Sequence, residues 1–348
     1  MAGSALLLVA AFTARAGEAA ATREAFRLRV VGGIAGVSQY LLHEEPFWSR
    51  DLARLTGGRY AADIVPFDRA GFPGQDMLTL IRLGVVPFGT ALLGPASAQY
   101  PELAAPDLAG LASDVGTLRK VVEAFRPTLA RLMRERHGTE LLAVYMYPAQ
   151  VVVCREPLGG LKDLAGRRTR VSSSTQSDLV RAVGSVPVLI PFSEVTASMR
   201  SKAVDCAVTG AVSGAAIGLP QVATTVYAQP ISWGLAVFGA NLGVWRSLPE
   251  ELRTLLMRQL PVLEASIWDE AERQSTFERA CTTARPCAPG TLDAMRVVHP
   301  SVEDQRLRQS LFEQQVLPAW VDRCGPECVA IWNTTIAPVV GARASERR

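Results

Sequence analysis

The chain has 348 residues, of which 49% are hydrophobic and 20% charged. This composition is typical of folded globular proteins and excludes a disordered chain. A net charge of only +3 excludes a strong field for nucleic acid or an anionic membrane. The length suffices for more than one core.

The N-terminus contains a short apolar run over residues 5–12 (ALLLVAAF), followed by the small residues Ala14 and Ala16. This pattern predicts a secretory signal peptide over residues 1–16 and a periplasmic mature protein. The first four residues lack Lys and Arg, so a disordered N-terminal extension is the alternative. The run is too short to span a bilayer, and no later segment has about 18 uninterrupted apolar residues.

The first part of the chain alternates between strand and helix patterns. The predicted strands are 27–31, 60–65 and 85–92, and the predicted helices are 43–55, 75–83 and 114–136. Such alternation predicts an α/β protein with a parallel sheet. Glu44 and Glu45 lie in the first helix, where we interpret them as solvated.

A second series of elements begins near residue 141. The predicted strands are 141–145, 150–154, 169–171, 186–190, 203–208 and 228–237, and the helices are 176–183, 193–200 and 248–279, the last interrupted at Pro261. Two α/β units in tandem predict two lobes, and binding pockets form preferentially between such units. The predicted division is 26–148 plus 235–275 for lobe I, 149–234 plus 276–335 for lobe II, and 336–348 as a frayed tail.

Six cysteines are distributed over the second half. Cys281 and Cys287, and Cys324 and Cys328, form two close pairs that we expect to be structural disulfides in a secreted chain, paired either locally or across. A zinc site is the competing interpretation, but neither pair has the Cys-x-x-Cys spacing. We expect the other two, Cys154 and Cys206, to be buried free thiols.

Enzyme motifs are missing from the sequence. The three histidines, His43, His137 and His299, are scattered along the chain. The sequence has no G-x-S-x-G elbow, Walker A loop or H-E-x-x-H motif. We therefore expect no enzyme, no cofactor and no metal.

An ordered series of short motifs identifies the family. Residues 163–171 read DLAGRRTRV, 191–195 read PFSEV, and 204–206 read VDC, whereas 56–59 upstream read TGGR. Over residues 27–280 this series resembles the DctP-like solute-binding subunits of tripartite ATP-independent periplasmic (TRAP) transporters. Cys206 onward departs from the family's V-D-G-x-E-N pattern.

The resemblance implies a fold and a partner. The fold would be a two-lobed α/β periplasmic binding protein, type II-like, with crossing hinge strands and a long lobe-spanning helix. The lobes would close on a small organic acid by a hinge movement. The partner would be the membrane permease subunits of a TRAP transporter.

The resemblance places the family's substrate-gripping arginine at Arg170. A guanidinium donates two parallel hydrogen bonds to a carboxylate and keeps its charge when water is excluded. A structural ion pair at Arg170 is the alternative. Ser173 and Thr209 fall at further contact positions of the family, Thr209 in place of an asparagine.

Four more residues complete the expected ligand site. Phe192 matches an aromatic that packs on the ligand, with core packing as the alternative. Gln150 replaces a second arginine of several relatives, which favours a ligand with one carboxylate. Tyr147 and Trp233 are expected to line an apolar pocket, which favours an aromatic or branched acid. A periplasmic sensor of the same fold and, less well supported, a secreted hydrolase are the alternative functions.

Overall fold

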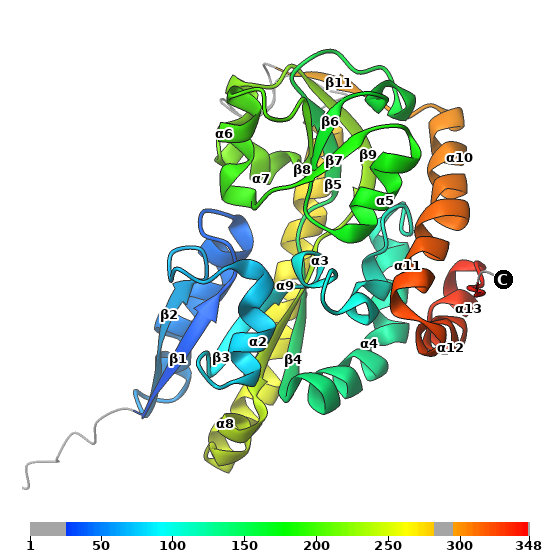
Figure 1. Ribbon diagram of the computed structural model, residues 1–348. Helices are drawn as coiled ribbons and strands as arrows, with labels where there is room; N and C mark the ends of the chain where they lie inside the picture. The colour runs from blue at the N-terminus through cyan, green and yellow to red at the C-terminus, as the bar shows by residue number, and fades with distance from the viewer. Residues whose placement is uncertain (1–25, 282–294, 347–348) are drawn as a thin grey trace, which may run out of the picture.

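The computed structural model describes residues 26–281 and 295–346, and the side chains of 26–275 and 295–346. The predicted signal peptide lies outside the described residues. Two lobes are visible in Figure 1, each built around its own β-sheet with helices packed against it. Both parallel and antiparallel strand pairs occur in each sheet. The predicted two-lobed α/β fold is confirmed.

The sheet of lobe I has five strands in the order β2-β1-β3-β10-β4. Their bounds are β1 Phe26–Gly32, β2 Tyr60–Pro66, β3 Phe88–Leu92, β4 Thr139–Met146 and β10 Leu235–Asn241. β1 pairs in parallel with β2 and β3, whereas β10 runs antiparallel to β3 and β4. β10 thus brings a distant part of the chain into the interior of the sheet, between β3 and β4.

The sheet of lobe II has six strands in the order β11-β9-β5-β8-β6-β7. Their bounds are β5 Gln150–Cys154, β6 Arg168–Val171, β7 Val186–Leu189, β8 Cys206–Gly210, β9 Thr225–Ser232 and β11 Arg296–Val298. The central strand β5 runs antiparallel to both of its neighbours, β8 and β9.

The chain crosses between the two sheets at 147–149, which join β4 to β5, and at 233–234, which join β9 to β10. The single strand predicted for 228–237 is therefore wrong: it is two strands, which belong to different sheets. Tyr147 N donates to Gly234 O at 3.1 Å, so the two crossings are hydrogen-bonded to each other. Gly234 has a φ of +73°, which explains why the turn uses glycine.

Asp107 of lobe I holds the second crossing. Its carboxylate accepts from Trp233 N and Gly234 N at 2.8 Å each, and from Leu235 N at 3.4 Å. Burial raises the pKa of Asp107 to about 6, and these three hydrogen bonds oppose that rise. Nothing in the sequence pattern marked Asp107 for this role.

Helices surround both sheets. The α-helices are α1 Leu52–Leu55, α2 Met77–Arg82, α3 Leu93–Ala96, α4 Val115–His137, α5 Ser174–Ala182, α6 Val195–Arg200, α7 Ala211–Ala216, α8 Leu242–Ser247, α9 Glu250–Cys281, α10 Val302–Leu311, α11 Leu317–Cys324, α12 Pro326–Thr335 and α13 Ala337–Val340. The π-helical segments are η1 Gln39–Glu44, η2 Phe47–Asp51 and η8 Phe312–Val316. The 3₁₀ segments are η3 Gly74–Asp76, η4 Pro101–Asp107, η5 Leu161–Leu164, η6 Phe192–Glu194 and η7 Leu219–Gln221.

Helix α9 is the predicted lobe-spanning helix. It runs unbroken through Pro261, so the predicted interruption is wrong. Trp268 Nε1 donates to Val144 O at 2.7 Å in lobe I, and Ser275 Oγ accepts from Ala149 N, in the first crossing, at 3.1 Å. In Figure 1 the helix extends from α8 behind both sheets.

The C-terminal helices α10–α13 contact both lobes. Arg323 pairs with Asp178 of α5 at 2.6 Å, and Trp320 Nε1 donates to Pro101 O of η4 at 2.7 Å. Residues 336–344 differ from the predicted frayed tail: Ile336 is fully buried and Trp332 Nε1 donates to Ala342 O at 2.8 Å. The apolar side chains of this segment fold back onto α12 and α4.

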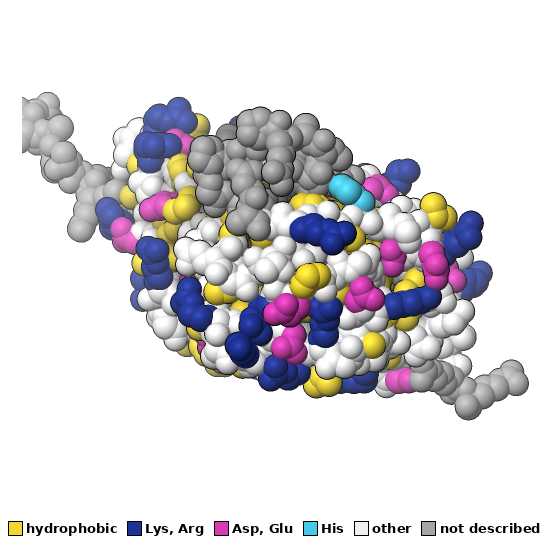
Figure 2. All heavy atoms as spheres, turned by 90° about the horizontal axis from the view of Figure 1, so that it is seen from above, with side chains coloured by type: hydrophobic (Ala, Val, Ile, Leu, Met, Phe, Trp, Pro, Cys, Tyr) yellow, Lys and Arg dark blue, Asp and Glu magenta, His cyan; other side chains and the backbone are white. Residues whose placement is uncertain are grey.

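On the face shown in Figure 2, Lys and Arg side chains are interspersed with Asp and Glu. Surface ion pairs such as Arg27–Asp63, at 2.7 Å, illustrate this mixture. No helix within residues 26–281 and 295–346 is long and apolar enough to cross a membrane.

Candidate ligand-binding site

Arg170 is a buried cation in the sheet of lobe II. It lies on β6, and only 3% of the residue is exposed. Its Nε donates to Ile190 O and its Nη1 to Val208 O, both at 2.8 Å. Among the residues that the structure describes, no carboxylate forms an ion pair with Arg170, and Nη2 donates to no protein atom.

The two carbonyl bonds orient the guanidinium without neutralising it. Burial lowers the pKa of Arg170 to about 10, so the side chain remains cationic at neutral pH. Removing an ion from water costs several kcal/mol, which a lone cation does not recover from carbonyl dipoles alone. Within the described residues, Arg170 is thus a buried cation whose hydrogen-bond partners are two backbone carbonyl groups.

Two predicted site residues are close in sequence to Arg170 or to one of its carbonyl partners. Thr209 is 1% exposed and follows Val208, whose carbonyl holds Arg170. Ser173 is 7% exposed and caps α5, its Oγ accepting from Gln176 N at 3.1 Å. Both hydroxyls therefore lie within a few residues of Arg170 or its carbonyl partner.

Gln150 and Tyr147 lie at and beside the first crossing. Gln150 is opposite Gly210 in the β5–β8 ladder, and its Nε2 donates to Pro148 O at 2.9 Å. A Cβ placed on Gly234 would come within 3.4 Å of Tyr147 Cβ and 3.5 Å of Gln150 Nε2. Tyr147 is 6% exposed, and its side chain belongs to the apolar core of lobe I.

Phe192 and Trp233 occupy different environments. Phe192, from lobe II, is partly buried and packs against the lobe I core, so it spans the two lobes. Trp233 is 1% exposed in the main core, and its Nε1 donates to Ala112 O at 3.1 Å. Its single polar side-chain atom is thus already used within the protein.

Glu44 is a buried carboxyl, not a solvated one. It is 1% exposed, and its Oε1 accepts from Thr90 Oγ1 and its Oε2 from Gly33 N, the latter at 2.7 Å. Burial raises its pKa to about 7, and both hydrogen bonds oppose that rise. The spacing of four along Tyr40, Glu44 and Trp48 places Glu44 on the inner helical face, which sequence reasoning could have recognised.

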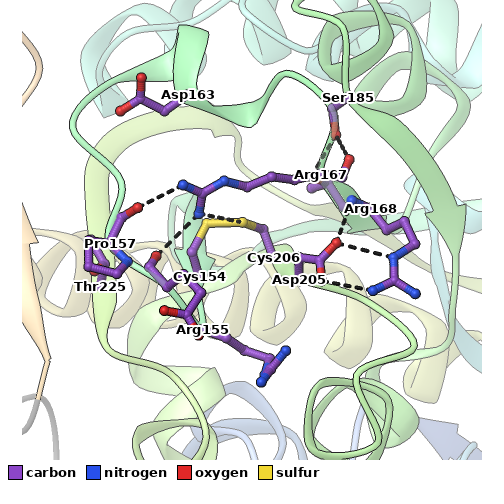
Figure 3. Close-up of a disulfide and its surroundings, with 12 residues drawn as sticks. Cys154, Arg155, Pro157, Asp163, Arg167, Arg168, Ser185, Asp205, Cys206 and Thr225 are labelled. Atoms are coloured by element: carbon purple, nitrogen blue, oxygen red, sulfur yellow. Dashed lines mark hydrogen bonds and ion pairs between the residues drawn. A yellow bond between two sulfur atoms is a disulfide. The ribbon is translucent and has the colours of Figure 1, made fainter.

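Cys154 and Cys206 form a disulfide, so the prediction of free thiols is wrong. They are directly opposite each other on β5 and β8, with 4.1 Å between their Cα atoms. Figure 3 shows Arg167 lying over the sulfur atoms while its Nη2 donates to Pro157 O at 2.7 Å. The strand register, which the sequence alone did not determine, brings the two cysteines together.

A further disulfide joins Cys324 to Cys328. Of the two pairings left open by the sequence, local or across, this is the local one. Cys287 and the side chain of Cys281 lie outside the described residues. Within the described part of the chain, no three His, Cys, Asp or Glu side chains converge as a metal-binding group.

Comparison with known proteins shows the family to which the chain belongs. Residues 36–281 match the family model for bacterial extracellular solute-binding protein, family 7, and the chain belongs to that family. The TRAP-type resemblance predicted from the sequence motifs is thereby confirmed.

Solved structures share the fold at low sequence identity. DctP7 of Bordetella pertussis, an extracytoplasmic solute receptor binding pyroglutamic acid, is 19% identical with a TM-score of 0.77, over 89% of this chain and 99% of that one. A Desulfovibrio salexigens TRAP solute-binding protein with bound orotic acid is 15% identical with a TM-score of 0.75, over 90% and 100%. One from Sulfurospirillum deleyianum with bound succinate is 16% identical with a TM-score of 0.72, over 90% and 99%.

Proposed function

We propose that this protein is a periplasmic receptor that binds a small organic acid between its lobes and delivers it to the permease of a TRAP transporter. Arg170 binds the carboxylate of the acid. The observation that carries the proposal is a buried guanidinium whose described partners are two carbonyl oxygens and no carboxylate. A bound carboxylate supplies the missing negative charge.

The ligand carries one carboxylate. Gln150, close to the crossings, offers an amide where a second arginine would favour a second anion. Pyroglutamic acid and orotic acid, bound by two of the similar structures, have one carboxyl group each, whereas succinate has two. The apolar ring of Phe192 on the lobe I core favours an aromatic or branched body for the acid. The protein has no catalytic role in this proposal.

The experiment is isothermal titration of the purified protein with pyroglutamate, orotate, a 2-oxo acid, phenylacetate and succinate. We expect a monocarboxylate to bind, and Arg170→Ala to weaken that binding at least about 30-fold, because truncating one partner of a buried charge pair costs roughly 2–5 kcal/mol. Arg170→Lys is expected to retain only part of the wild-type affinity, because an ammonium group lacks the planar fork of a guanidinium.

Arg168→Ala is the matched control. Arg168 lies on the same strand but its guanidinium is exposed and pairs with Asp205 at 2.8 Å. Its loss is expected to leave the affinity unchanged. Equal weakening by both substitutions, or tight binding of succinate alone, would contradict the proposal.

A further inference from the structure

Lobe I contains a buried carboxyl group, Glu44, that has no cationic partner within the described part of the chain. Glu44 has no Lys, Arg or His partner among the described residues, and its neighbours are a hydroxyl and a backbone N–H. A buried carboxylate without a cation is unfavourable in its charged form, which is why burial raises the pKa of Glu44 to about 7.

Gly33 lies close both to the carboxyl of Glu44 and to the phenol of Tyr147, a residue of the first crossing. A Cβ added to Gly33 would lie 2.5 Å from Tyr147 Oη and 3.0 Å from Glu44 Oε2. The glycine therefore allows the phenol and the carboxyl to approach the same backbone atoms. The negative charge of Glu44 also contributes, after burial, to raising the pKa of Tyr147.

Two polar residues near the first crossing, Tyr147 and Gln150, lie between the surroundings of Glu44 and the sheet of lobe II. Tyr147 and Gln150 both lie beside Gly234, and Gln150 Nε2 lies 3.6 Å from a Cβ placed on Gly210. Gly210 ends β8, the strand whose Val208 carbonyl holds Arg170. Tyr147 and Gln150 therefore connect the surroundings of Glu44 in lobe I with the end of the strand whose backbone carbonyl binds Arg170.

The same helical segment, η1, contains a second buried polar side chain, that of Gln39. Gln39 is 1% exposed, and neither its amide oxygen nor its amide nitrogen has a hydrogen-bond partner in the part of the chain that is described. It precedes Glu44 by five residues in η1, about one π-helical turn. A buried amide with two unused polar atoms is rare in proteins and calls for a partner.

We propose that Glu44 is a specificity-determining residue that accepts a hydrogen bond from an N–H or O–H group of the ligand. The inference rests on the proposed function, because it concerns the same site. Arg170 binds the carboxylate of the acid, and Glu44 selects acids that also carry a donor. Both oxygens of Glu44 already accept one hydrogen bond each, and a carboxylate oxygen has a further lone pair.

The test uses pairs of monocarboxylates that differ in a single donor. The pairs are mandelate and phenylacetate, and 2-hydroxyisocaproate and 4-methylpentanoate. Titration calorimetry of the wild type is expected to show the donor-bearing member of the bound pair at least about 10-fold tighter, the effect of one hydrogen bond to a charged group.

Glu44→Gln is expected to reduce that ratio to within about 3-fold, because the amide retains one acceptor and loses the charge. Glu45→Gln is the matched control on the neighbouring residue, which is partly exposed, and it should keep the wild-type ratio. Circular dichroism verifies that each variant is folded.

The outcomes separate the two proposals. If acids bind the wild type but the donor makes no difference, or if Glu44→Gln keeps the wild-type ratio, the role of Glu44 is refuted and the proposed function stands. If Glu44→Gln does not fold, the wild-type ratio alone decides. If no acid binds the wild type at all, both proposals are refuted.

Discussion

Cys154 and Cys206 are bonded across β5 and β8 at one end of a ladder whose other end is the Gln150–Gly210 pair. Between these ends, Val208 of β8 accepts the hydrogen bond from Arg170. The disulfide therefore fixes the register of the two strands on which the proposed ligand site is built. Arg168 and Asp205, visible beside the sulfur atoms in Figure 3, tie β6 to the same region.

We predict that Cys154→Ser with Cys206→Ser lowers the free energy of unfolding by roughly 4 kcal/mol, because the cross-link closes a loop of 52 residues in the unfolded chain. Urea unfolding followed by tryptophan fluorescence measures the change. Cys324→Ser with Cys328→Ser is the control, and its loop of 4 residues predicts a loss of only about 2 kcal/mol. Equal losses for both double variants would contradict this account.

The alternation of strands and helices was predictable from sequence because apolar spacing and glycine stops mark most elements. The ordered motifs around residues 163–206 identified the family and placed Arg170 on a strand, although no isolated motif was specific. The break between β9 and β10 was missed because 228–237 is a nearly continuous apolar run. Only tertiary pairing assigns its two halves to different sheets.

The parts of the site that escaped prediction depend on contacts between distant residues. The Cys154–Cys206 bond requires the β5–β8 register, and the role of Asp107 requires the crossing at Trp233. Glu44 was predictable in part, since Tyr40 and Trp48 flank it at helical spacing and both are buried. Acidic pairs usually face solvent, and that general tendency misled the sequence interpretation.

Asp107→Ala is predicted to lower the free energy of unfolding by roughly 3 kcal/mol, because it leaves the N–H groups of Trp233 and Gly234 buried without an acceptor. Chemical denaturation at neutral pH measures the loss. Asp269→Ala is the control, since Asp269 is exposed and pairs with the surface residue Arg119, and a loss below about 1 kcal/mol is expected. A similar small loss for Asp107→Ala would show that the crossing does not depend on this carboxylate.

The raised pKa of Glu44 predicts how the free energy of unfolding changes with pH. Its pKa is about 7 in the folded protein against an ordinary value of 4.5, so the folded state binds the proton more tightly than the unfolded chain. The free energy of unfolding of the ligand-free protein should therefore decrease as the pH rises from about 4.5 to about 7, by roughly 3 kcal/mol from this group.

Unfolding experiments on wild type and Glu44→Gln over this pH range measure the effect. Asp107, whose pKa is raised to about 6 from 3.8, changes stability in the same direction and is present in both proteins. The difference between the two curves isolates Glu44. Parallel curves would mean that Glu44 titrates normally and that its burial is not maintained in solution.

The proposed function requires Arg170 to bind the carboxylate of an organic acid. A crystal structure of the complex with the tightest-binding monocarboxylate tests it most directly. We expect a carboxylate oxygen about 2.7–2.9 Å from the Nη2 atom of Arg170, with the bonds to Ile190 O and Val208 O retained. A ligand whose carboxylate lies elsewhere, with the Arg170 guanidinium contacting only protein atoms, would contradict it.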